Sequence, residues 1–338
     1  MATAATLPLL WLRWRQRVLG SLFHGLARLG DLDSSLRAAR ADVDVQLDVP
    51  YGPHPVAHRL DVYRPRHVDG PLPVMLYIHG GAFVLCSKDT HRHLALLNAH
   101  RAGYLVFNIN YRLAPQHPFP AAIADACAAY RWVCAHAREY GGDPERIVVA
   151  GESAGGNLAL GVAIAASYRR PETYTRSMFR CPTPLGVMPL MPLLQTSDPA
   201  RRAGQVGVNR LALSVLKDIE RAYLGGPFTA ASAPLLADPV RVLEECGRPD
   251  RVFPQVFSGA GTADLCCADV RRLAQACREL GIPVETAYFR DEGHAFHALH
   301  WREAARRFWR RSVRFLRGVA GLPARVAPIV RRASAARV

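Results

Sequence analysis

The sequence predicts an α/β protein built on a mainly parallel sheet. Apolar segments typical of strands alternate along the chain with segments typical of helices, and several of the apolar segments are uninterrupted. Uninterrupted apolar strands are typical of sheets covered on both faces, and their alternation with helices is typical of parallel pairing. We expect strands at 43–49, 57–63, 73–79, 104–110, 146–150, 183–190, 252–257 and 283–289.

Helices and two further segments complete this organisation. Helices are expected at about 90–102, 120–138, 154–168, 265–280 and 298–317. Residues 1–42 look like an N-terminal helical segment, and residues 192–232 contain a loop and a helix that ends at a glycine pair. We interpret both as parts of a cap over a main domain of residues 43–318, which a basic tail of residues 319–338 follows.

Composition narrows the class of protein. The 338 residues are half hydrophobic, which is enough for a large core. The sequence contains no run of about 18 apolar residues, so no membrane-spanning helix is predicted. The apolar residues 7–12 precede their arginines, whereas a secretory signal has the opposite order. The eight cysteines are irregularly spaced without a C-x-x-C pair, which favours reduced thiols over a disulfide framework or a zinc site. We therefore expect a cytoplasmic protein.

The net charge of +15 is concentrated at the C-terminus. From Trp301 onward the chain has eleven arginines and one acidic residue, Glu303. Because no nucleic-acid-binding motif accompanies this charge, we expect no nucleic-acid partner. Two interpretations stay open: a solvated basic end without a role, and a peripheral contact with anionic membranes.

The stretch GESAG, residues 151–155, predicts a nucleophile. It follows a strand and precedes a helix, as in the G-x-S-x-G elbow that lifts a serine Oγ above a sheet. The crowded turn excludes side chains next to the serine, which explains Gly151 and Gly155. By itself the pattern fits equally a tight turn in which Ser153 caps the helix.

A second glycine stretch, YIHGGAF at 77–83, follows another strand. Acyl transfer places negative charge on the former carbonyl oxygen, which preorganised N–H donors must face. We predict that the backbone amides of Gly80, Gly81 and Ala154 form this oxyanion hole. A flexible glycine loop is the alternative for the HGG stretch alone.

Together these motifs resemble a known family. HGGAF, then YRLAPQHPFPAA at 111–122, then GESAGG is similar to the hormone-sensitive-lipase-like branch of the α/β-hydrolases, which are serine carboxylesterases. The resemblance covers residues of about 45 to 300. It implies a mostly parallel eight-stranded sheet with helices on both faces and a helical cap. Ala82 replaces the usual third glycine, and Glu152 replaces the more frequent aspartate.

The base and the acid are expected after the serine, in the order Ser, acid, His. His294 lies in DEGHAF after a strand, and the stretch resembles the family motif G-x-x-H-x-F. We predict His297 and His300 to be surface residues. Asp264 resembles the family acid in GTxDxLxxD, so the predicted triad is Ser153, Asp264 and His294.

Two other carboxylates compete with Asp264. Asp269 lies within the following helix and is expected to point to solvent, and Glu292 cannot easily reach Nδ1 of its sequence neighbour His294. A metal site at His91 and His93 is not expected, because the two diverge on a helix and no carboxylate joins them.

The resemblance implies a serine carboxylesterase that cleaves short- to medium-chain acyl esters through an acyl-enzyme. No metal and no cofactor are expected. A lactone hydrolase or amide deacetylase with the same triad stays an alternative. A non-catalytic small-molecule receptor on the same fold is disfavoured by the presence of His294.

Overall fold

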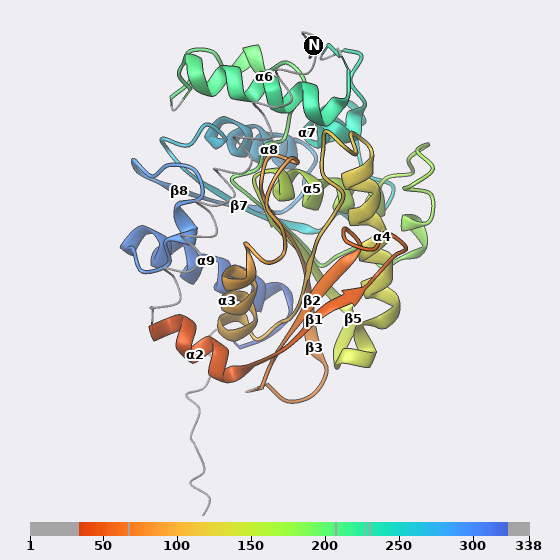
Figure 1. The fold of residues 1–338 in the computed structure, drawn as a ribbon, viewed down its shortest axis with the longest axis vertical. Helices are drawn as coiled ribbons and strands as arrows, with labels where there is room; N and C mark the ends of the chain where they lie inside the picture. Colours follow the sequence, from red (N-terminus) through yellow and green to blue (C-terminus); the bar gives the residue numbers. More distant parts are fainter. Residues whose placement is uncertain (1–33, 67, 207, 227, 230, 324–338) are drawn as a thin grey trace, which may run out of the picture.

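The computed structural model describes residues 34–66, 68–206, 208–226, 228–229 and 231–323 (Figure 1). Most of the predicted N-terminal helical segment and most of the basic tail lie outside these residues. Within them, no helix is long and apolar enough to span a membrane.

A single eight-stranded sheet forms the centre of the described chain. Its strands are β1 (Val43–Pro50), β2 (Arg59–Pro65), β3 (Leu72–Ile78), β4 (Leu105–Ile109), β5 (Gly142–Glu152), β6 (Gly186–Leu190), β7 (Gln255–Gly261) and β8 (Val284–Phe289). Their order is β1-β2-β4-β3-β5-β6-β7-β8. β2 pairs antiparallel with β1 and β4, and all other pairs are parallel. The predicted eight-stranded, mostly parallel sheet is confirmed.

The start of β7 differs from the prediction. We expected this strand at 252–257, and it begins at Gln255 instead. Pro254 has no N–H to give to a ladder, and Val252 is exposed. The later start moves the end of the strand to Gly261, close to Asp264.

The helices form layers on the two faces of the sheet (Figure 1). They are α2 (Ser34–Asp42), α3 (Arg92–Ala102), α4 (Ala121–His136), α5 (Ala154–Ser167), α6 (Arg210–Leu224), α7 (Pro239–Glu245), α8 (Cys267–Glu279) and α9 (Glu303–Val319), with 3₁₀ turns η1 (Ala137–Tyr140), η2 (Met178–Arg180), η3 (Pro199–Arg202), η4 (Leu235–Ala237) and η5 (Phe296–Ala298). One layer contains α2, α3 and α9, which contact one another in that order; α4, α5, α7 and α8 form the other contact series. The central strands are therefore buried on both faces, as their apolar sequences predict.

Helix α6 lies apart from these layers, at the top of Figure 1. Asn209 caps its first turn by accepting the Ala212 N–H at 2.8 Å, and Gly225 ends it in the left-handed conformation (φ 75°). Tyr223 fixes the C-terminal end to the body, because its ring stacks on Phe83 with 3.7 Å between centroids. The helix expected within 192–232 is thus present and is attached beside the HGGAF stretch.

Candidate active site

Ser153 stands at the sharp turn between β5 and α5. Its backbone has φ 53° and ψ −117°, a conformation that costs a non-glycine residue about 1–3 kcal/mol. Three backbone hydrogen bonds hold it there: its N–H donates to Leu190 O at 2.9 Å, and its carbonyl oxygen accepts the N–H groups of Asn157 and Leu193, each at 3.1 Å. The turn is therefore a nucleophile elbow in its backbone geometry.

The glycines around Ser153 are required by close backbone approach. A Cβ on Gly151 would lie 2.3 Å from Gly155 O, and a Cβ on Gly155 would lie 2.1 Å from Ile78 O. These neighbours are backbone atoms that no side-chain rotation can move aside. The elbow thus packs directly on the end of β3, where the HGGAF stretch begins.

The hydroxyl of Ser153 does not cap helix α5. Ser153 occupies the N-cap position, but its side chain makes no capping hydrogen bond. The alternative interpretation of GESAG, a serine that serves only as a helix cap, is therefore contradicted. Ala154 is the first residue of α5, where the backbone N–H groups lack intrahelical acceptors and the helix dipole favours negative charge.

His294 and Asp264 form a hydrogen-bonded pair. Nδ1 of His294 lies 2.9 Å from Oδ1 and 3.0 Å from Oδ2 of Asp264. The carboxylate is fully buried and also accepts the Cys266 N–H at 2.7 Å, whereas the His294 ring is one-third exposed. Burial opposes the imidazolium charge, but the hydrogen bonds to Asp264 and Cys266 outweigh it and raise the pKa of His294 well above 6.5. This is the arrangement of a base oriented by a carboxylate.

Asp269 has a different environment from the one predicted. It is completely buried rather than solvent-facing, and it forms ion pairs with Arg201 (2.7 Å) and Arg202. It also accepts the Leu194 N–H at 2.8 Å. Arg202 is itself buried and donates to Leu265 O at 2.6 Å, so this pair fixes the loop that carries Asp264. The prediction for Asp269 is wrong because its partners come from a distant segment.

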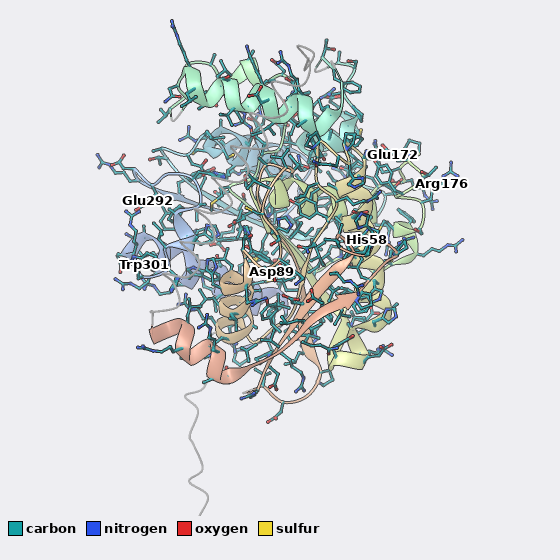
Figure 2. The ribbon with its side chains drawn as sticks, in the orientation of Figure 1. His58, Asp89, Glu172, Arg176, Glu292 and Trp301 are labelled. Carbon is teal, nitrogen blue, oxygen red and sulfur yellow. The ribbon has the colours of Figure 1, made fainter. Side chains whose placement is uncertain are left out.

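Glu292 is held away from His294. Its carboxylate pairs with Arg302 at 2.9 and 3.0 Å, near the outer edge of the molecule (Figure 2). Within the described residues, Asp264 is the carboxylate hydrogen-bonded to Nδ1 of His294.

Side-chain contacts brace the HGG stretch. His79 is buried, which lowers its pKa to about 3, and its Nδ1 lies 2.7 Å from Gly80 O. Its ring stacks on Tyr111 of the YRLAP stretch, whose hydroxyl donates to His79 O at 3.0 Å. Gly81 has φ 120°, and a Cβ there would lie 2.0 Å from Leu85 O. A neutral histidine and a tyrosine therefore brace this loop.

The amide of Gly80 has a partner that sequence reasoning did not anticipate. Its N–H is directed toward the His91 ring, whose Nε2 lies 3.3 Å away and faces Glu152 at 2.6 Å. The next two residues, Gly81 and Ala82, also line the cavity beside Ser153. The direction of this N–H disfavours Gly80 as a donor to the oxyanion.

A buried carboxylate, Glu152, connects three parts of the site. Its Oε1 lies 2.6 Å from Nε2 of His91, and its Oε2 lies 2.5 Å from Nε2 of His297. Burial alone would raise the pKa of Glu152, but His297 and His91 outweigh that effect and lower it well below its usual value. Glu152 thus ties the elbow to the segment that follows His294 and to the start of α3.

This network corrects three predictions. His297 and His300 are buried rather than on the surface, and a carboxylate, Glu152, does join His91. His93 is half-buried, and desolvation lowers its pKa to about 3, so its ring is neutral. Sequence reasoning missed these contacts, although the H-x-x-H spacing of His294 and His297 and the unusual Glu152 were visible signals.

A cavity of 470 Å³ connects the candidate residues. Ser153, His294 and the HGGA loop form its floor, and Cys266 and Leu265 lie beside them. Helix α6 lines the other side with Leu211, Ala212, Val215, Leu216 and Ile219. The lining around the polar floor is thus mostly apolar, as suits an acyl chain beside a reacting carbonyl.

Among the described residues, one group has ligand atoms spaced for a metal ion. Asp264, Cys266 and His294 offer atoms within 4.8 Å of one another. Because Nδ1 of His294 already pairs with Asp264, the geometry is accounted for by a protonated ring nitrogen facing a carboxylate.

Comparison with known proteins identifies the family. The sequence matches the family described as alpha/beta hydrolase fold over residues 75–298. An acetyl-hydrolase of Streptomyces hygroscopicus is 32% identical over 239 residues, which are 70% of this chain and 71% of that protein. The chain belongs to the α/β-hydrolase family. The resemblance to its hormone-sensitive-lipase-like branch is thereby confirmed.

Other relatives of this α/β-hydrolase match over shorter segments. Carboxylesterase NlhH of Mycobacterium tuberculosis is 51% identical over 102 residues, which are 30% of this chain and 32% of NlhH. Esterase LipI of the same organism is 47% identical over 122 residues, which are 36% of this chain and 37% of LipI. The aligned part of this chain thus spans about a third of the length of these two relatives.

Solved structures agree with the fold. An esterase from Pyrobaculum calidifontis has a TM-score of 0.72 at 23% identity, covering 90% of this chain and 93% of that one. Esterase LipW of Mycobacterium marinum has a TM-score of 0.71 at 26% identity and covers 89% of each chain. The α/β-hydrolase architecture predicted from the motifs is confirmed.

Proposed function

We propose that this α/β-hydrolase is a serine carboxylesterase that acts through an acyl-enzyme. The observation that carries the proposal is the uncapped hydroxyl of Ser153 at a strained elbow, in one cavity with His294, whose Nδ1 is paired with buried Asp264. A serine hydroxyl becomes nucleophilic when a base removes its proton, and that base needs an orienting partner.

The proposed reaction has two halves. Ser153 Oγ attacks the ester carbonyl while Nε2 of His294 takes its proton, and His294 then gives the proton to the departing alcohol. Water repeats the sequence on the acyl-enzyme and restores Ser153. Asp264 holds His294 with Nε2 free to accept, and it stabilises the imidazolium formed in each half.

For the oxyanion hole we propose the amides of Gly81 and Ala154, with Ala82 in place of Gly80. Gly80, Gly81 and Ala82 all line the cavity, but the Gly80 N–H is directed toward the His91 ring. Ala154 contributes from the start of α5, where the helix dipole also favours an oxyanion. Each such donor lowers the barrier by about 2.7–4 kcal/mol.

The preferred substrates are proposed to be esters of short- to medium-chain acids. The cavity of 470 Å³ lies at the small end of the range typical of ligand pockets, about 300–1,000 Å³. Its apolar side is formed by α6, and we propose that residues 192–232 serve as the cap that closes it. A long-chain triglyceride exceeds this volume.

The proposal is tested with Ser153→Ala, using Ser214→Ala on the exposed face of α6 as the matched control. We expect Ser153→Ala to lose about 10⁴–10⁶-fold in kcat on p-nitrophenyl butyrate with an unchanged circular dichroism spectrum, and Ser214→Ala to resemble wild type. An organophosphate should label one site, on the peptide with Ser153. Near-normal turnover by Ser153→Ala would refute the assignment.

Parallel assays distinguish the alternatives that share this machinery. Lactones and N-acetyl amides should turn over more slowly than butyrate esters. Faster turnover of either would reassign the substrate class while retaining the triad. Wild-type protein that binds an ester without hydrolysing it would favour the receptor function instead.

We also propose a peripheral contact with anionic membranes, through the arginine-rich C-terminus. Arg307, Arg310, Arg311 and Arg314 of α9 line a cavity of 750 Å³ together with Arg290. Glu303 and Glu285 pair with several of them, which reduces the local excess of positive charge. Co-sedimentation with phosphatidylserine vesicles, compared with phosphatidylcholine vesicles at low and high salt, tests this contact. Equal recovery with both vesicle types would contradict it.

A further inference from the structure

The loop that carries Asp264 contacts an arginine from the proposed cap, residues 192–232. Arg202 is the last residue of the 3₁₀ turn η3, which leads to the cap helix α6 and contacts it. Its side chain is completely buried, and its Nη1 donates to the carbonyl oxygen of Leu265 at 2.6 Å. Leu265 directly follows Asp264 and lines the cavity at Ser153. An arginine that is distant in sequence thus contacts the backbone beside the proposed acid.

One peptide group connects Arg202 to the triad. The Leu265 carbonyl oxygen, which accepts from Arg202, and the Cys266 N–H belong to the same peptide group. That N–H donates to Oδ1 of Asp264 at 2.7 Å, and Oδ1 in turn lies 2.9 Å from Nδ1 of His294. Because a peptide group is planar, a contact that fixes the direction of its C=O also fixes the direction of its N–H. The hydrogen bonds therefore form a continuous series from the guanidinium of Arg202 to the proposed base.

Asp269 explains how Arg202 can be buried at this position. A buried guanidinium is costly unless a carboxylate faces it and its N–H groups find acceptors. Nη2 of Arg202 forms an ion pair with Asp269, while Nη1 has the Leu265 carbonyl oxygen as its acceptor. The planar fork of arginine reaches both partners at once, which the single ammonium group of lysine cannot do.

The same carboxylate contacts the nucleophile side of the site. Asp269 accepts the Leu194 N–H at 2.8 Å. The preceding residue, Leu193, donates its N–H to the carbonyl oxygen of Ser153 at 3.1 Å. The pair formed by Arg202 and Asp269 therefore joins the backbone of the acid loop to the backbone next to the elbow.

We propose that Arg202 is a positioning residue for the esterase reaction: through the peptide group between Leu265 and Cys266, it directs the Asp264 carboxylate toward Nδ1 of His294. This inference rests on the proposed function of the triad. Arg202 is absent from the described residues that line the cavity, so it acts through the peptide group rather than on the substrate. If the peptide plane turns, Oδ1 loses its N–H donor and the carboxylate leaves the geometry that keeps the proton on Nδ1.

The substitution Arg202→Lys tests this role. Lysine retains the positive charge beside Asp269 and removes the planar fork. We expect kcat on p-nitrophenyl butyrate to fall about 10- to 100-fold with little change in KM, because the orientation of the base is altered and the cavity lining is not. The double variant Arg202→Met, Asp269→Leu removes both buried charges together, which costs less stability than removing one, and it should show at least the same fall in kcat.

The matched control is the same substitution at the neighbouring residue, Arg201→Lys. Arg201 pairs with the same carboxylate, Asp269, at 2.7 Å, but it also donates to the carbonyl oxygen of Gln195 at 3.5 Å and not to the acid loop. We expect this control to keep kcat within a few-fold of wild type. Thermal unfolding of both variants measures the stability that each substitution costs.

Two readouts separate positioning from a loss of stability. Burial lowers the pKa of His294, but the hydrogen bond to Asp264 outweighs it and raises the pKa, with a contribution from Cys266. A misdirected carboxylate should therefore move the midpoint of kcat/KM to lower pH in Arg202→Lys, in which the charge at position 202 and both groups facing His294 are retained. The downfield proton resonance of the His294 Nδ1–H should also move upfield or broaden. Neither change is expected in Arg201→Lys.

The outcomes that overturn the proposal are specific. A folded Arg202→Lys variant with the kcat, pH midpoint and His294 resonance of wild type would overturn it. A rise in KM without a fall in kcat would also do so, because it would assign Arg202 to the shape of the cap. Equal effects in Arg201→Lys would assign the role to the charge beside Asp269 instead of the contact with Leu265. Failure of the proposed function is distinguishable, because Ser153→Ala would then retain turnover while the His294 resonance still reported on Arg202.

Discussion

Replacing Asp264 by asparagine should invert the protonation of His294 while retaining the shape of the site. The carboxylate has two acceptor oxygens: Oδ1 accepts the Cys266 N–H at 2.7 Å, and both oxygens lie within 3.0 Å of Nδ1 of His294. Asparagine has one acceptor and one NH₂ group. Because Asp264 is fully buried, no water can replace a lost partner there.

The short bond from the Cys266 N–H decides which way the amide turns. If the asparagine oxygen keeps that bond, its NH₂ faces Nδ1 of His294 and requires a lone pair there. The proton then resides on Nε2, the nitrogen that must accept the proton of Ser153. We therefore expect kcat to fall on the order of 10³–10⁴-fold, as expected for loss of the correct tautomer, with a smaller change in KM.

The assay is hydrolysis of p-nitrophenyl butyrate across pH 5 to 10, with thermal unfolding as the measure of folding. Glu292→Gln is the matched control, because Glu292 is a carboxylate much nearer to His294 in sequence than Asp264 but pairs with Arg302. We expect the control to retain kcat within a few-fold of wild type. A folded Asp264→Asn variant with kcat within tenfold of wild type would refute the assignment of Asp264 as the orienting acid.

Four further predictions follow from the same contacts. Because His294 must be neutral to accept a proton and its pKa is raised, kcat/KM of the wild type should rise with pH through a midpoint above 6.5; a midpoint below 6 would contradict this. Asp269→Asn should lower the free energy of unfolding by about 3–5 kcal/mol, measured by urea denaturation, because Arg201 and Arg202 lose the charge of a buried partner. Glu152→Gln should reduce kcat about tenfold at pH 7. Wild type should lose stability as the pH falls below about 4.5, because the lowered pKa of Glu152 favours the folded state only while its carboxyl group is ionised, and the variant should lack this loss. Unchanged acid unfolding of the variant would contradict the network. Val215→Trp should shrink the cavity from α6 and lower the ratio of octanoate to acetate turnover about tenfold, and an unchanged ratio would exclude α6 from the acyl pocket.

Local sequence was sufficient for the sheet and for the elbow. A few neighbouring residues determine the order of the strands along the chain and the terminal glycine of α6. The pattern GESAG between a strand and a helix could be recognised in the sequence, although the crowding at Gly155 comes from Ile78 at the end of β3. His294 could be placed in the same way, because its loop directly follows a strand.

The tertiary structure decided which polar groups meet. Asp269 looked like a surface carboxylate, because it lies in a helix whose next turn carries Arg271 and Arg272. Arg201 and Arg202, more than 60 residues earlier, bury it. His91 and Glu152 are 61 residues apart in sequence and share one hydrogen bond. The backbone nitrogen of Gly80 lies beside the same His91 ring and so borders this buried network. Burial and charge pairing depend on all the elements that close around a side chain, whereas periodicity and turn chemistry depend only on the residues alongside it. For this reason the sequence indicated the chemistry at Ser153, and the fold determined how Glu152 and Asp269 support it.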